Sequence, residues 1–107
     1  MPVENNRLLL ELEKFRRDIN RSVINPEIPE LTLQDLKPVL TMIAHTRADY
    51  LRELLDIARL SPDSGPSPDQ VKHLKSCRET YEELVAAMNA LETAIQRDYL
   101  DVRSEKG

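Results

Sequence analysis

Residues 67–102, SPDQVKHLKSCRETYEELVAAMNALETAIQRDYLDV, decide the fold, because they read as one long helix. Ser67 can accept hydrogen bonds from the first free N–H groups, Pro68 suits the first helical position, and Gln70 completes a capping box. Apolar side chains then recur at helical spacings of three and four residues, at Leu74, Cys77, Tyr81, Leu84, Met88, Leu91 and Ile95. We therefore predict a helix over residues 68–102.

A helix of that length spans about 50 Å and cannot bury its apolar stripe without neighbours. Residues 61–67, SPDSGPS, form the clearest turn in the chain, since they hold two prolines and Gly65. This turn is short enough to bring the preceding helix back antiparallel against the long one. The sequence therefore predicts an antiparallel helical hairpin, followed by a polar tail over residues 103–107.

The helix before this turn is predicted to span residues 36–60. Its apolar residues cover roughly 160° of the helix, a width typical of a helix that contacts two neighbours. Thr32 and Asp35 have the spacing of a capping box, but Pro38 would remove a hydrogen bond from a helix that began at Thr32. We therefore expect the chain to break before Leu36, in preference to a helix that kinks at Pro38.

Residues 4–24 are predicted to form the first helix, with its apolar face at Leu8, Leu12, Phe15, Ile19 and Val23. Pro26 and Pro29 make residues 25–31 a connector, because neither proline fits a helix interior. The expected fold class is all-α, a three-helix bundle built on the long antiparallel hairpin. We expect a single domain over residues 1–107, with the first helix packed across the other two.

The composition excludes several classes of protein. The 107 residues carry a net charge of −4, with acidic and basic side chains mixed throughout, so nucleic acid is not an expected partner. A single cysteine excludes an internal disulfide and favours a reducing compartment. The apolar run near the N-terminus is too short for a signal peptide, and no stretch reaches the roughly 18 apolar residues of a membrane span. The expected location is the cytoplasm.

Motifs for catalysis or metal binding are sparse. His73 and Cys77 lie four residues apart on the predicted helix, as half of a zinc site requires, but a closed site needs four ligands. Cys77 also belongs to the apolar stripe, where a free cysteine behaves as a small hydrophobic residue. A phosphate-binding loop needs several glycines, and the chain has only Gly65 and Gly107. We therefore expect no enzyme activity, no metal and no cofactor.

Arg47 is the most informative single residue, because it lies inside the apolar arc of the second helix. Burying a guanidinium without a partner is prohibitively costly. Three solutions are open: the stem lies on the core while the head reaches water, the head pairs with Glu82 or Glu11, or an anion or partner carboxylate completes the site. A hairpin centred on residues 61–67 places Arg47 opposite Tyr81.

The expected function is a non-catalytic protein–protein interaction module, an adaptor, chaperone or assembly subunit that acts through a helix face and forms a homodimer. Surplus apolar side chains off or beyond the stripes support it: Leu9, Leu10, Leu100 and Val102. Candidate contacts for a partner or an anion are Arg47, Tyr50, Tyr81, Arg16 and Arg17. One alternative is a small regulatory ligand-binding bundle or minor enzyme, with a pocket near Arg47, Tyr50 and Tyr81. Another is a DNA-associated regulator that uses the N-terminal arginines.

Overall fold

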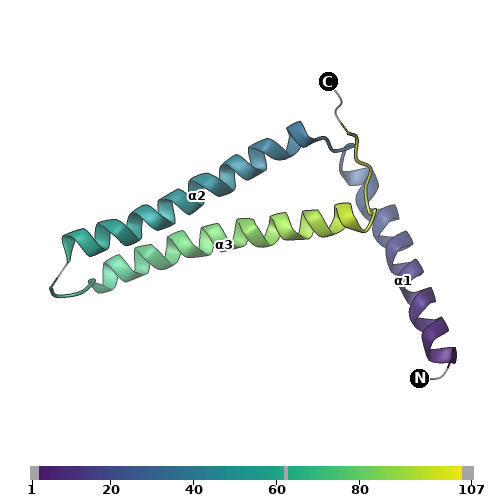
Figure 1. The fold of residues 1–107 in the computed structure, drawn as a ribbon, viewed down its shortest axis with the longest axis horizontal. Coiled ribbons are helices and arrows are strands. Elements are labelled where there is room, and N and C mark those ends of the chain that lie inside the picture. Colours follow the sequence, from purple (N-terminus) through teal and green to yellow (C-terminus); the bar gives the residue numbers. More distant parts are fainter. Residues whose placement is uncertain (1–2, 62, 105–107) are drawn as a thin grey trace. The chain divides into compact units, whose positions relative to one another are not determined.

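The computed structural model describes residues 3–61 and 63–104 and is built from helices, as predicted (Figure 1). The α-helices are α1 (Val3–Ile24), α2 (Leu33–Leu60) and α3 (Pro68–Gln96), and a 3-10 turn, η1 (Asn25–Glu27), follows α1. Helices α2 and α3 pack against each other as an antiparallel hairpin. The all-α class and the hairpin are therefore confirmed.

The contacts within the chain divide it into two units. One unit comprises Met1–Asp35 with Ala90–Gly107, and so joins α1 to the end of α3 and the C-terminal segment. The other comprises Leu36–Asn89, which is the body of the hairpin. Each unit contains its own buried residues, Ile43 and Ile57 in the hairpin and Ala94, Tyr99 and Leu100 in the other unit.

The hairpin unit has a capping box at the start of α3, as the sequence predicts. The N–H of Ser67 donates to Oε1 of Gln70 at 2.8 Å, and the N–H of Gln70 donates back to Oγ of Ser67 at 3.1 Å. The Ser61 hydroxyl at the end of α2 also donates to Gln70 Oε1, at 3.2 Å. Gly65 adopts the left-handed conformation with φ of 74°, which glycine reaches without steric cost. Pro62 lies outside the described residues.

The seam between α2 and α3 uses alternating spacings of three and four residues on both helices. On α2 the buried and half-buried positions include Leu36, Val39, Ile43, Thr46, Tyr50, Glu53 and Ile57. On α3 they include Gln70, Leu74, Cys77, Tyr81, Leu84 and Met88. This alternation is the pattern of a coiled-coil seam, in which side chains of one helix insert between those of the other. It confirms the stripe predicted for the long helix.

The expected break before Leu36 is wrong. Helix α2 begins at Leu33 and continues through Pro38. The capping box is present: the N–H of Thr32 donates to Oδ2 of Asp35 at 2.9 Å, and the N–H of Asp35 points back to Oγ1 of Thr32 at 3.4 Å. This cap stabilises the first turn. Pro38 therefore costs one hydrogen bond near the helix end without ending the helix.

The predicted extension of the long helix to residue 102 is also wrong, because α3 ends at Gln96. Asp98 adopts a left-handed conformation with φ of 62°. The N–H of Tyr99 donates to the carbonyl of Ala94 at 2.9 Å, and the N–H of Asp98 donates to the carbonyl of Ile95 at 3.2 Å. These two bonds are a Schellman motif, with aspartate in the position that glycine usually occupies.

Beyond this stop the chain runs extended beside the connector that precedes α2. The N–H of Leu31 donates to the carbonyl of Asp101 at 3.0 Å, and the N–H of Arg103 donates to the carbonyl of Leu31 at 2.8 Å. Leu31 and Val102 thus form an isolated parallel bridge. The end of the predicted polar tail, residues 105–107, lies outside the described residues.

The reversal of the chain after α3 buries Leu100, which is only 1% exposed. Leu100 lies in a core cluster with Tyr99 and Ala94. Partly buried side chains pack around this cluster, namely Ile24, Ile28, Leu31, Leu91 and Ile95. The prediction that Leu100 is an apolar side chain left for a partner is therefore wrong. The other three residues of that prediction, Leu9, Leu10 and Val102, are more than half exposed, as expected.

Candidate functional site: an apolar face on α1

The apolar face of α1 is exposed along the whole helix. None of the 22 residues of α1 is buried, although the sequence places five large apolar side chains on one side of it. The exposed fractions of these side chains run from 47% to 63%, at Leu8, Leu12, Phe15, Ile19 and Val23. We call these five residues the α1 stripe. A contiguous exposed apolar surface of this kind marks an interaction site more often than a random feature.

The polar side of α1 is held by the C-terminal segment of its own unit. Arg21 donates from Nη1 to the carbonyl of Asp98 at 2.9 Å and to the carboxylate of Asp98 at 3.2 Å. Its Nη2 pairs with the carboxylate of Asp101. About two turns towards the N-terminus, Glu13 pairs with Arg97 at 3.2 Å. At 100° per residue these α1 positions lie away from the stripe, so the docking leaves the stripe uncovered.

The carboxylate of Asp101 accepts hydrogen bonds from two side chains of this unit, Arg21 and Asn25. Hydrogen bonds from Arg21 and Asn25 lower the pKa of Asp101, and the nearby charge of Arg21 adds to the effect. The same hydrogen bond, which Arg21 donates and Asp101 accepts, raises the pKa of Arg21 above its ordinary value. The N–H of Asp101 also donates to Oδ1 of Asn25 at 2.9 Å. These contacts fix the C-terminal segment against the end of α1.

One flank of the α1 stripe is acidic. Glu4, Glu11 and Asp18 recur every seven residues, so they lie in one row along the helix. None of the three forms an ion pair with another described residue within 4.0 Å. This row was not predicted, although its seven-residue spacing can be read from the sequence. An acidic row beside an apolar stripe indicates a partner surface that is apolar and basic.

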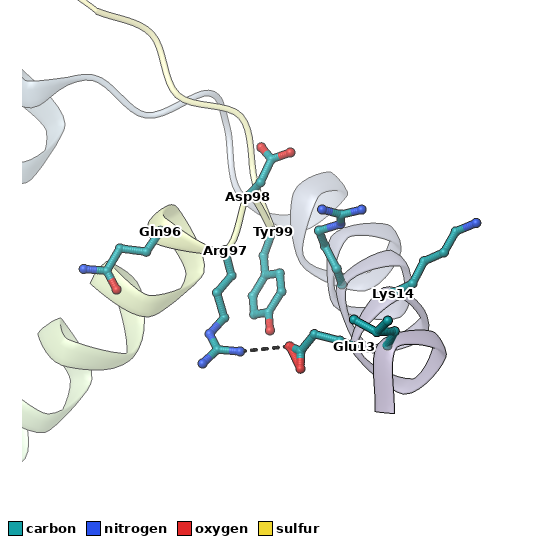
Figure 2. Close-up of a pocket in the computed structure, with 8 residues that line it drawn as sticks. Glu13, Lys14, Gln96, Arg97, Asp98 and Tyr99 are labelled. Atoms are coloured by element: carbon teal, nitrogen blue, oxygen red, sulfur yellow. Dashed lines mark hydrogen bonds and ion pairs between the residues drawn. The ribbon is translucent and has the colours of Figure 1, made fainter. Parts of the chain in front are cut away.

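A shallow hollow of about 440 Å³ lies between α1 and the C-terminal segment of the same unit. Arg17, Lys14 and Arg97 line it together with Tyr99, which is buried. Figure 2 shows Tyr99 and Arg97 reaching from the C-terminal segment towards α1, where Arg97 pairs with Glu13, while Lys14 points away. The hollow was not predicted from the sequence, because the end of α3 that creates it was not predicted.

The two arginines predicted as partner contacts have different surroundings. Arg16 donates from Nη1 to the carboxylate of Glu13 at 2.7 Å, a pair within one turn of the helix. Arg17 lines the hollow and forms no ion pair with another described residue. The two arginines therefore do not form one basic site.

The hairpin brings together the three other predicted contacts. Arg47 donates to the hydroxyl of Tyr81 from Nε at 3.0 Å and from Nη2 at 2.7 Å. The rings of Tyr50 and Tyr81 are tilted, with centres 6.3 Å apart. Neither predicted acid pairs with Arg47 among the described residues, and Glu82 lies 3.6 Å from Arg78 instead. The guanidinium is exposed, so its head reaches water while it binds a neutral hydroxyl.

Helix α2 has a second apolar row on the side that does not face α3. Leu40, Leu51 and Leu55 are about half exposed or more, and Ala44 between them is exposed as well. We call these four residues the α2 stripe. The apolar arc predicted for this helix was wide enough for two neighbours, and within the hairpin α3 covers only one part of it.

The His73–Cys77 pair does not resemble a metal site. Nδ1 of His73 lies 2.9 Å from the carboxylate of Glu53, and Cys77 is half-buried in the hairpin seam. Across residues 3–61 and 63–104, no three side chains of the metal-binding types come together. In the same part of the chain, no helix combines the length and the apolar character needed to cross a membrane.

Comparison with known proteins finds no matching family model, no matching curated protein and no matching solved structure.

Proposed function

We propose that the chain is a non-catalytic protein–protein interaction module whose working surface is the α1 stripe. The observation that carries this proposal is a 22-residue amphipathic helix without a buried residue. Most helices of soluble proteins are stable because their apolar face is packed. In α1 the polar side contacts the C-terminal segment and the apolar face remains exposed. The apolar face is therefore free to bind a protein partner.

The size of the stripe limits the kind of contact that α1 makes alone. Five apolar side chains exposed to this degree offer on the order of 500 Å² of surface, so that α1 and one matching surface bury on the order of 1,000 Å². This value is at the lower end of specific interfaces. A stable assembly therefore uses the stripe more than once or extends it with a second surface.

The proposal is tested by removing the stripe without changing the fold. Replacing Leu12 and Phe15 together with Ser should leave the helical circular dichroism unchanged, because neither side chain is buried. The double variant should lose both self-association, measured by light scattering, and stoichiometric protein partners in co-purification. The matched control is Leu10→Ser, on the opposite side of α1 and 73% exposed, which should keep every association. Equal binding by the stripe variant and wild type would exclude the α1 stripe as the working surface.

The alternative function, a small ligand-binding protein, is favoured by one observation. The hollow beside Tyr99 has a volume in the range of small-molecule sites, and Arg17 in its lining has no ion-pair partner among the described residues. A small anion would suit it. Inorganic phosphate should then raise the melting temperature of wild type and leave Arg17→Gln unchanged. Equal shifts in both proteins, or no shift in either, would reject this site.

A further inference from the structure

The α1 stripe and the α2 stripe share one spacing. Leu8, Leu12, Ile19 and Val23 are separated by four, seven and four residues. The α2 stripe has the same three intervals, at Leu40, Ala44, Leu51 and Leu55. At 100° per residue each set covers an arc of about 60°. Two helices with equal spacing can pair along their full common length, with the side chains of one inserted between those of the other.

The charges beside the two stripes are opposite. The α1 stripe is flanked by the acidic row Glu4, Glu11 and Asp18. On α2, Lys37 lies seven residues before Ala44, at the edge of the α2 stripe, and Arg52 lies beyond the same edge. Viewed along the same direction, the acids lie to one side of their stripe and the bases to the other side of theirs. Two parallel helices that face each other bring the acidic flank of α1 to the edge of α2 where the two bases lie.

Arg52 already pairs with Asp49 of its own helix at 2.7 Å. An exposed pair of this kind contributes little stability, and the five N–H donors of a guanidinium can bind a second carboxylate. The existing pair therefore does not prevent a contact with an acid on another chain.

We infer that α1 of one copy packs parallel to α2 of a second copy, and that the second copy returns the same contact. The inference rests on the proposed function and names the partner as another copy of this chain. It places Leu8 beside Leu40, Leu12 beside Ala44 and Ile19 beside Leu51. In the same register Glu4 approaches Lys37, and Asp18 approaches Arg52.

This register also gives Arg47 a role. Phe15, the remaining residue of the α1 stripe, comes level with Arg47 and its exposed neighbour Ala48. The small side chain of Ala48 leaves room for the ring, and the guanidinium that Tyr81 holds offers a flat surface for it. The predicted packing of the first helix across the hairpin is then made between copies.

Chain length excludes the same contact within one copy. In this register the end of α1 is level with residue 56, so the chain would have to return about 35 Å along the axis to begin α2 at Leu33. The nine steps from Ile24 to Leu33 reach about 31 Å when fully extended. Three of the residues between them are coiled in η1, which shortens the reach further.

The buried area fits a stable dimer. The α1 stripe exposes on the order of 500 Å² and the α2 stripe on the order of 300 Å², so that two reciprocal contacts bury on the order of 1,600 Å², the standard size of a specific interface. One contact alone would bury half of that. In the reciprocal dimer the α1 stripe of each copy is buried, so the assembly contains two such contacts, as a stable interface needs.

Charge reversal and mixing test the pairing. One variant carries Glu4→Lys and Asp18→Lys, and the other carries Lys37→Glu and Arg52→Glu, all at exposed positions. Each variant alone places like charges together in both contacts, and its dimer dissociation constant should rise about tenfold or more, less so at high salt. An equimolar mixture should regain the dimer in sedimentation velocity, because both contacts then join opposite charges. The matched control, Lys72→Glu with Lys75→Glu on the exposed side of α3, should dimerise like wild type.

The outcomes separate this inference from the proposed function. Dimers in wild type and in the mixture, but not in either variant alone, support the inference. A mixture that stays monomeric overturns it, as does a wild type that is monomeric at tens of micromolar. If the monomeric wild type still binds another protein through Leu12 and Phe15, the proposed function stands and only the second copy is excluded. If it binds nothing, both proposals fail.

Discussion

Arg47 and Tyr81 meet across the hairpin, where the guanidinium donates two hydrogen bonds to the phenol oxygen, at 3.0 and 2.7 Å. The guanidinium carbon lies 5.2 Å from the ring centre, a separation that follows from its position beside the hydroxyl. The pair joins α2 and α3 at one level of the seam. Within the hairpin unit, the predicted partner Glu82 lies 3.6 Å from Arg78 instead.

A double-mutant cycle on this pair should give a coupling free energy of about 0.5–1 kcal/mol, the net value of an exposed hydrogen bond. Arg47→Met and Tyr81→Phe each remove one side of the contact while keeping most of the packing. Urea unfolding of wild type, both single variants and the double variant provides the measurement. Arg52→Met is the control, because its partner Asp49 is on the same helix. A coupling indistinguishable from zero would show that the contact adds no stability.

Replacing Pro38 with Ala should raise the free energy of unfolding by about 1–3 kcal/mol, because α2 already continues through this position. The new N–H can donate to the carbonyl of Gln34, which proline leaves without its helical partner. The control is Ala48→Gly on the same helix, which should lower stability by about 1 kcal/mol. Lower stability of Pro38→Ala in urea unfolding would mean that the ring itself is needed for packing.

Replacing Leu100 with Ala should lower the free energy of unfolding by about 2–5 kcal/mol, because the side chain is 1% exposed and lies in the core cluster. Leu10→Ala, at a position that is 73% exposed, should change it by no more than about 0.5 kcal/mol. Chemical unfolding of the two variants under the same conditions makes the comparison. If both substitutions lowered the free energy of unfolding by the same small amount, the C-terminal segment would not be part of the cooperative core.

Acid should weaken the attachment of the C-terminal segment to α1. The pKa of Asp101 is lowered in the folded state, so its stabilising contribution is complete above the ordinary value of 3.8 and is lost as the pH falls through the lowered value. The melting temperature of wild type should therefore fall below about pH 4. Asp101→Asn should melt lower than wild type at neutral pH and show a smaller fall in acid.

Asp98→Asn is the matched control for this prediction, because it removes a second carboxylate beside Arg21 and keeps a residue that tolerates the left-handed conformation. Its acid dependence should stay close to that of wild type. If Asp101→Asn and wild type lose the same stability in acid, another carboxylate controls the transition.

The start of α3 was readable from the sequence because it depends on local contacts, whereas the start of α2 was predicted near Leu36 because of Pro38 and lies at Leu33. Ser67 and Gln70 are three residues apart and form the predicted cap. Thr32 and Asp35 have the same spacing and also form a cap, although the prediction placed the helix start after them. The turn with Gly65 determines which residues of α2 and α3 are level with each other, so the position of Arg47 opposite Tyr81 also followed from counting. The exposed stripe and acidic row of α1 are likewise periodic patterns along one helix.

The end of α3 was decided by tertiary structure. The apolar residues Leu100 and Val102 continue a helical pattern, and no glycine marks the stop, so local preference alone extends the helix. The structure instead turns at Asp98, where the left-handed conformation costs little for an aspartate. In return the chain buries Leu100, pairs Val102 with Leu31 and brings Asp101 to Arg21. These contacts join residues some 70 to 80 positions apart, and their combined free energy outweighs one more turn of helix.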